Sequence, residues 1–142
     1  MTQEDKDLLY RDLCARLPYG VMVREDTVLY DNKNTTSYRI KKLSYVLIGK
    51  GFSKIKGFIH DYEYIYKPYL FPLSSMTEEQ KQEYSYIVNY LSSDDTDNWK
   101  EGEFVYVDQM SELMHFFYKN HLDFRGLIKQ DLAIDATGLN IY

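Results

Sequence analysis

A basic and aromatic segment between residues 33 and 68 is the strongest candidate for a binding surface. It carries eight Lys or Arg against two acidic residues, whereas the other 106 residues carry nine basic and twenty acidic side chains. Seven aromatic side chains are interleaved with the basic ones: Tyr38, Tyr45, Phe52, Phe58, Tyr62, Tyr64 and Tyr66. Cations bind phosphates and flat rings stack on bases, so this composition suits a nucleic acid.

The residues that would contact a nucleic acid lie in the middle of this segment. They are Arg39, Lys41, Lys42, Lys50, Phe52, Lys54 and Lys56. The run Lys50-Gly51-Phe52 is similar to the start of the RNA-recognition strand motif, but the residues that follow do not continue it. The alternative is a sheet whose lysines protect an exposed edge and whose aromatic face is core. The chain's net charge of −5 disfavours non-specific DNA binding, because the field of the whole protein repels phosphate.

A second group of reactive side chains, His121, Asp123 and Arg125, lies near the end of the chain. A histidine beside a carboxylate can transfer protons, so this loop is a candidate site for a small enzyme. The alternative is structural: Asp123 organises a turn and Arg125 locks the loop through carboxylates or carbonyls. No residue is assigned as catalytic on this evidence.

The cysteine and histidine pattern argues against a metal centre. Cys14 is the single cysteine, which excludes an intrachain disulfide and a cysteine zinc cluster, and its helical context predicts a buried thiol. His115 and His121 are six residues apart and do not match the pair of a zinc helix. We therefore expect neither a metal nor a cofactor.

Length and composition predict one globular domain over residues 1–142. The N-terminus is polar, with no apolar stretch typical of a signal peptide, and no apolar run reaches the roughly 20 residues of a membrane helix. We expect a cytoplasmic protein that does not bind a membrane. Fifteen tyrosines favour strands and contact surfaces.

The periodicity predicts helices at 3–17, 78–91 and 109–119. Thr2 with Asp5, and Thr77 with Gln80, form the capping boxes of the first two helices, and Asp108 is the expected cap of the third. The run Ser92 to Asn98 is interpreted as a solvated acidic loop.

Strands are expected between residues 21 and 66. Residues 21–24 and 27–30 read as a tight hairpin turning at Glu25-Asp26, and residues 36–48 read as extended chain. Strict alternation over 58–67 places Phe58, His60, Tyr62, Tyr64 and Tyr66 on one strand face, which we expect to be core. The fold class is therefore α+β, a small antiparallel sheet packed with the three helices.

Three stretches resemble a family of short proteins from gut Bacteroidetes and their phages or integrated mobile elements. They are residues 13–20 (LCARLPYG), 67–77 (KPYLFPLSSMT) and 123–128 (DFRGLI). The family carries no known activity, cofactor or catalytic residue. The resemblance implies a bacterial or phage setting and an accessory role.

These patterns leave three functional hypotheses. The leading one is a non-enzymatic protein that binds another protein through a tyrosine-rich surface, since tyrosine adds contact area at low conformational cost. The second is nucleic-acid binding through the turn at 50–56, and the third is an enzyme acting through His121 and Asp123. The sequence leaves the oligomeric state, the partner and any ligand open.

Overall fold

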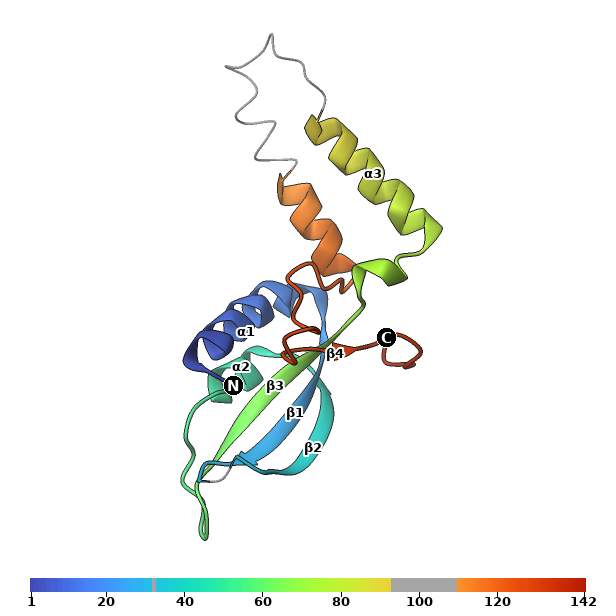
Figure 1. The fold of residues 1–142 in the computed structure, drawn as a ribbon. Helices are drawn as coiled ribbons and strands as arrows, with labels where there is room; N and C mark the ends of the chain where they lie inside the picture. Colours follow the sequence, from blue (N-terminus) through green and yellow to red (C-terminus); the bar gives the residue numbers. More distant parts are fainter. Residues whose placement is uncertain (32, 93–109) are drawn as a thin grey trace, which may run out of the picture.

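The computed structural model describes residues 1–31, 33–92 and 110–142 and confirms the α+β fold class (Figure 1). The elements in chain order are α1 (Gln3–Arg16), η1 (Leu17–Tyr19), β1 (Met22–Leu29), β2 (Thr35–Lys42), α2 (Tyr45–Lys50), β3 (Tyr62–Leu70), η2 (Leu73–Ser75), α3 (Glu78–Ser92) and β4 (Ile134–Asp135). Residues 110–119 are also helical. The expected cap Asp108 and residues 93–98 of the acidic run lie outside the described residues.

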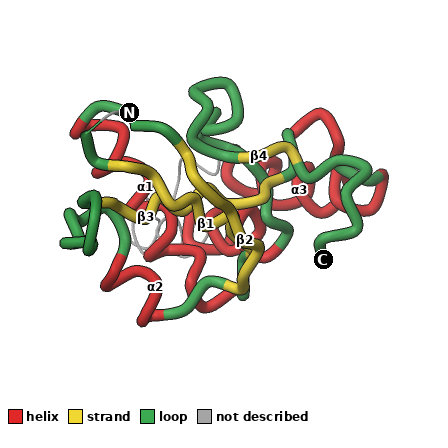
Figure 2. The backbone as a smooth tube through the Cα atoms, turned by 90° about the horizontal axis from the view of Figure 1, so that it is seen from below, coloured by secondary structure: helices red, strands yellow, loops and turns green. Residues whose placement is uncertain are grey.

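The strands form one curled sheet in the order β2-β1-β3-β4, with β2 at its outer edge (Figures 1 and 2). β1 pairs antiparallel with both β2 and β3, which confirms the expectation of an antiparallel sheet in this region. The sheet extends beyond residue 66, because β3 continues to Leu70 and β4 pairs with its end in parallel. The prediction of a wholly antiparallel sheet is therefore correct for three of the four strands.

The predicted hairpin at Glu25-Asp26 is wrong, because these residues lie in the middle of the continuous central strand β1. Both side chains are buried and paired. Glu25 accepts from Lys41 at 2.7 Å and from the Tyr66 hydroxyl at 3.1 Å, and Asp26 lies 2.8 Å from the Arg24 guanidinium. Lys41 and Arg24 compensate the charges of Glu25 and Asp26. The two carboxylates can therefore lie inside a strand, although this pair of residues is typical of a turn.

The extended chain predicted over 36–48 ends at Lys42, and a short helix follows. The Ser44 side chain accepts from the backbone N–H of Leu47 and caps α2, which directs Ile48 into the core. Ser44 was the missed signal, because serine before a helix is a preferred cap.

The strand predicted to start at residue 58 begins at Tyr62. A bridge between Ile55 and Tyr62 closes a loop whose tip projects Phe58 and Ile59 into solvent. A side chain at Gly57 would meet the carbonyl oxygen of His60 at 2.0 Å, so the turn requires glycine there. The strand therefore begins four residues later than the alternation predicts. Phe58 and His60 are exposed and do not belong to the core.

Both predicted capping boxes are present. Thr2 and Asp5 bond each other's backbone N–H groups at the start of α1, and Thr77 and Gln80 do the same before α3. Each box gives partners to two backbone N–H groups at the start of the helix. These two helix starts could therefore be predicted from the sequence.

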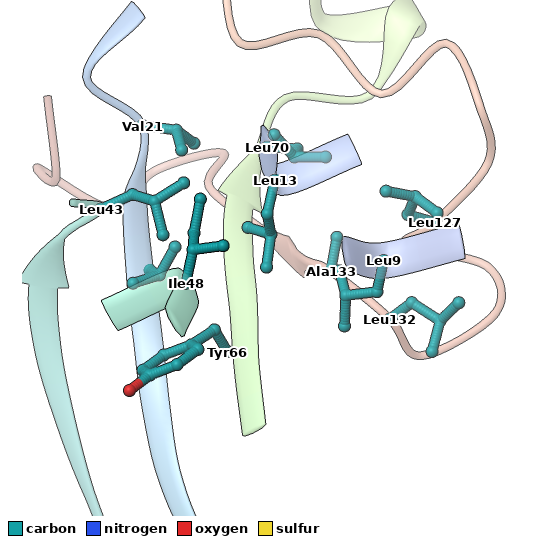
Figure 3. Packing of buried hydrophobic residues seen from close by; sticks show 11 residues of the cluster. Leu9, Leu13, Val21, Leu43, Ile48, Tyr66, Leu70, Leu127, Leu132 and Ala133 are labelled. Atoms are coloured by element: carbon teal, nitrogen blue, oxygen red, sulfur yellow. The ribbon is translucent and has the colours of Figure 1, made fainter. Parts of the chain in front are cut away.

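The main core joins α1 and α2 to the sheet and to the loop that precedes β4 (Figure 3). Its fully buried members include Leu9 and Leu13 from α1, Val23 from β1 and Tyr66 from β3. A second cluster packs α3 against the helix at 110–119 and the chain beyond it, through Ile87, Phe116, Phe117 and Leu122. Cys14 is exposed, so the expectation of a buried thiol is wrong.

Glu63 on β3 is a buried carboxylate held by two lysines. Lys6 of α1 and Lys33 of the loop before β2 lie 2.7 and 2.9 Å from its two oxygens. Burial by itself would raise the pKa of Glu63, but the two lysine hydrogen bonds outweigh it, so the pKa lies below its ordinary value of 4.5. Since the folded state favours the ionised form, this group stabilises the fold above pH 4.5, and the contribution is lost as the pH falls through the lowered value.

We predict that Glu63→Gln removes this acid-sensitive component of stability. Urea unfolding of the wild type should show a loss of stability as the pH falls below about 4.5, and the difference between wild type and variant should shrink over the same range. Glu4→Gln, an exposed change on α1, is the control. A difference between wild type and Glu63→Gln that is constant with pH would contradict the prediction.

Candidate functional site

The predicted nucleic-acid residues do not share one environment. Lys41 bonds Glu25 at 2.7 Å, and Lys54 lies 2.8 Å from Asp61 and 4.6 Å from the Tyr30 ring centroid. Phe52 packs against the main core, edge-on to Tyr66. Three of the seven residues therefore pack within the protein or pair with its own acids.

The other four, Arg39, Lys42, Lys50 and Lys56, are exposed. Arg39 and Lys42 belong to β2, Lys50 ends α2, and Lys56 lies in the loop before β3. Of these elements, β2 presents the longest exposed surface, because seven of its eight residues are exposed.

β2 exposes apolar side chains as well as basic ones. Tyr38 is 65% exposed and Ile40 is 46% exposed, although both belong to a regular strand. Alternation places these two on one face of the strand and Arg39 and Lys41 on the other. Tyr38 also lies 5.8 Å from the Arg24 guanidinium carbon, which restrains its ring beside β1.

The second predicted group, in the loop at 121–125, does not converge on one point. The two Asp123 oxygens accept from the backbone N–H groups of Leu127 and Ile128 at 2.8 and 2.9 Å. His121 stacks on Tyr142 with a centroid distance of 4.1 Å, and Arg125 reaches Asp12. This geometry matches the structural interpretation of Asp123 and Arg125 and gives no support to the enzyme hypothesis.

Asp12 and Arg16 form a buried ion pair that sequence reasoning missed. Both side chains are fully buried, and Arg16 Nε lies 2.6 Å from Asp12 Oδ2. Arg16 also donates to the Leu122 carbonyl at 2.9 Å, while Arg125 Nε lies 3.2 Å from Asp12 Oδ1. The available signal was the i, i+4 spacing of Asp12 and Arg16 on the same side of α1 as Leu9 and Leu13.

His121 lies beside this ion pair in a half-buried position. Burial first, and then the positive charge of Arg16, lower the pKa of His121 to about 4. The ring is therefore neutral near pH 7 and stacks on Tyr142 without a charge. His121 Nδ1 and Arg16 Nη1 have no hydrogen-bond partner among the described residues.

Over residues 1–31, 33–92 and 110–142, no three His, Cys, Asp or Glu side chains gather closely enough to hold a metal ion. No helix in these ranges combines the length and the apolar character that crossing a membrane requires.

Comparisons with known proteins return nothing: no family model, curated protein or solved structure matches the chain. The functional proposals below therefore rest on the geometry of this chain's own surfaces.

We predict that Asp12→Ala destabilises the protein by about 3–5 kcal/mol, because it leaves the buried Arg16 charge uncompensated. The free energy of unfolding in urea measures this loss. Asp7→Ala, an exposed aspartate on the same helix, is the control and should change stability far less. A loss below about 1 kcal/mol for Asp12→Ala would show that the ion pair is not a structural necessity.

We also predict a pH dependence from His121. Its pKa is lowered on folding from 6.5 to about 4, so the unfolded chain binds a proton that the folded protein does not, and stability falls as the pH is lowered from 6.5 to 4. His121→Asn keeps a residue that tolerates the positive φ of 52° at this position but removes the titration. The stability difference between pH 7 and pH 5 should therefore be smaller in the variant; an unchanged difference would refute the assignment.

Proposed function

We propose that this protein binds another protein, whose extended segment pairs as an added strand with the free edge of β2. The observation that carries the proposal is an eight-residue edge strand that is exposed almost throughout and still presents Tyr38 and Ile40 to solvent. An edge strand has a row of backbone donors and acceptors available for a partner strand.

The side chains of β2 supply the specificity. Tyr38 and Ile40 would pack on apolar residues at alternate positions of the added strand, and tyrosine is enriched among residues that dominate binding energy. Arg39 and Lys42 are exposed on the same strand, so an acidic extended segment is the charge-complementary partner. Basic residues on an edge also disfavour uncontrolled pairing between copies.

The proposal keeps part of the leading sequence hypothesis. Tyrosine-rich protein binding is retained but confined to β2, since Tyr64 packs against the main core and Tyr66 lies fully buried within it. The accessory role and the cytoplasmic setting, in a bacterium or phage-infected cell, also remain proposals.

Nucleic-acid binding is the competing explanation for the same cations. It receives less support, because Lys41 and Lys54 pair with acids of the chain and Phe52 packs into the core. Phe52, the one ring among the predicted contact residues, packs against the protein itself instead of standing free to stack on a base.

The test is a titration of the labelled protein, followed by amide NMR and hydrogen exchange. The probes are an acidic peptide of about ten residues that alternates valine with glutamate, its lysine counterpart, and oligodeoxythymidylate of similar reach. We expect the acidic peptide to shift β2 resonances and to slow exchange at alternate β2 amides, because only alternate N–H groups point outward.

Tyr38→Ser should weaken the acidic peptide about fivefold to tenfold, since it removes a central apolar contact. Tyr45→Ser is the matched control, because Tyr45 is also exposed but lies on α2. Equal losses in the two variants, or shifts away from β2, would reject strand addition. Binding of the oligonucleotide alone would favour the nucleic-acid hypothesis instead.

A further inference from the structure

A cleft of about 730 Å³ is lined by residues of α1, η1, α3 and the helix at 110–119. Its volume lies within the range of about 300–1,000 Å³ that small-ligand sites occupy. Three tyrosines, two glutamates and one histidine dominate its lining: Tyr19, Tyr86, Tyr118, Glu83, Glu112 and His115. None of them belongs to β2, so this site is independent of strand addition.

The aromatic side chains form one wall of the cleft. The Tyr19 ring lies 5.3 Å from the His115 ring and 5.7 Å from the Tyr118 ring, between centroids. A 2.9 Å hydrogen bond between the Tyr19 hydroxyl and His115 Nδ1 holds the first two rings together. Tyr118 is buried and held from behind by the Arg16 guanidinium, whose carbon lies 5.2 Å from the ring centroid. The wall is therefore braced before any ligand arrives.

The described residues that line the cleft include acidic side chains and no basic ones. Glu83 on α3 and Glu112 on the facing helix both line it, and no Lys or Arg is among the described lining residues. Carboxylates beside the faces of aromatic rings attract organic cations, since the rings carry negative faces and the acids add a full charge.

One lysine of the protein, which is not among the lining residues, pairs with Glu83. Lys119 Nζ lies 3.4 Å from Glu83 Oε1, and both side chains are about half exposed. That distance exceeds the 2.7–2.9 Å or so of a strong charged hydrogen bond, and exposed pairs of this kind contribute little stability. An ammonium group from a ligand can therefore replace Lys119 at low cost.

We propose that the cleft binds an organic amine with an aromatic body. The body would lie along Tyr19, Tyr86 and the apolar floor at Ile87, and the ammonium would lie between Glu83 and Glu112.

Three probes with the same body and different charge test this: phenethylamine, 2-phenylethanol and phenylacetate, each titrated at pH 7 and followed by amide NMR. We expect phenethylamine to shift resonances of α3 and the helix at 110–119, and to bind about tenfold more tightly than 2-phenylethanol. Phenylacetate should bind most weakly. Equal binding of the alcohol, preference for the acid, or no shift in these helices with any probe would overturn the proposal.

Variants separate local from general charge effects. Glu83→Gln with Glu112→Gln should lower the phenethylamine affinity about tenfold, whereas Glu4→Gln with Glu79→Gln removes the same charge outside the cleft and should leave it nearly unchanged. Lys119→Gln should raise the affinity, because it removes the competing ammonium. All five residues are exposed, so the variants should fold, which circular dichroism verifies. Equal losses in the two double variants would also reject the site.

Discussion

The buried ion pair of Asp12 and Arg16 is the interaction on which the arrangement of the two hydrophobic clusters depends. Arg16 ends α1, whose leucines belong to the main core, yet its guanidinium donates to the Leu122 carbonyl and lies over the Phe124 ring of the second cluster. A fully buried guanidinium is tolerated only where a carboxylate and carbonyl compensate its lost hydration. Asp12 meets that requirement and also pairs with Arg125, so one carboxylate links α1 to the 122–127 loop.

The same requirement explains part of the basic segment. The sheet buries Glu25, Asp26 and Glu63, and each is matched by a nearby Lys or Arg. The positive charge that makes residues 33–68 resemble a nucleic-acid surface is thus partly used inside the fold, by Lys33 and Lys41 in particular. Of the four exposed predicted cations, Arg39 and Lys42 lie on the edge strand β2, beside Tyr38 and Ile40, and this mixture suits a protein strand better than a phosphate backbone.

The sequence predicts an element correctly where a short stretch of residues contains all the contacts that form it. The boxes Thr2–Asp5 and Thr77–Gln80 start their helices through contacts three residues apart, and α1 and α3 follow within a residue or two of their predicted bounds. The strand errors share another cause. Glu25-Asp26 is typical of a turn, and the partners of Glu25 that hold it in a strand, Lys41 and Tyr66, are distant in sequence. Residues 58–61 alternate like a strand, although Gly57 turns the chain there.

The sequence by itself determined the α+β fold class and the starts of α1 and α3, because these follow from hydrophobic period and capping within a few residues. Only the tertiary structure decided the role of each charged side chain. Arg16 is fully buried although arginine is mostly exposed in proteins, while Lys54, a predicted nucleic-acid contact, pairs with Asp61. It also decided the site: Tyr19, Glu83 and Glu112 line one cleft from three separate helices. Contacts between residues distant in the sequence decide whether a charged side chain is paired inside the fold or exposed for binding. Local sequence spacing does not encode these contacts.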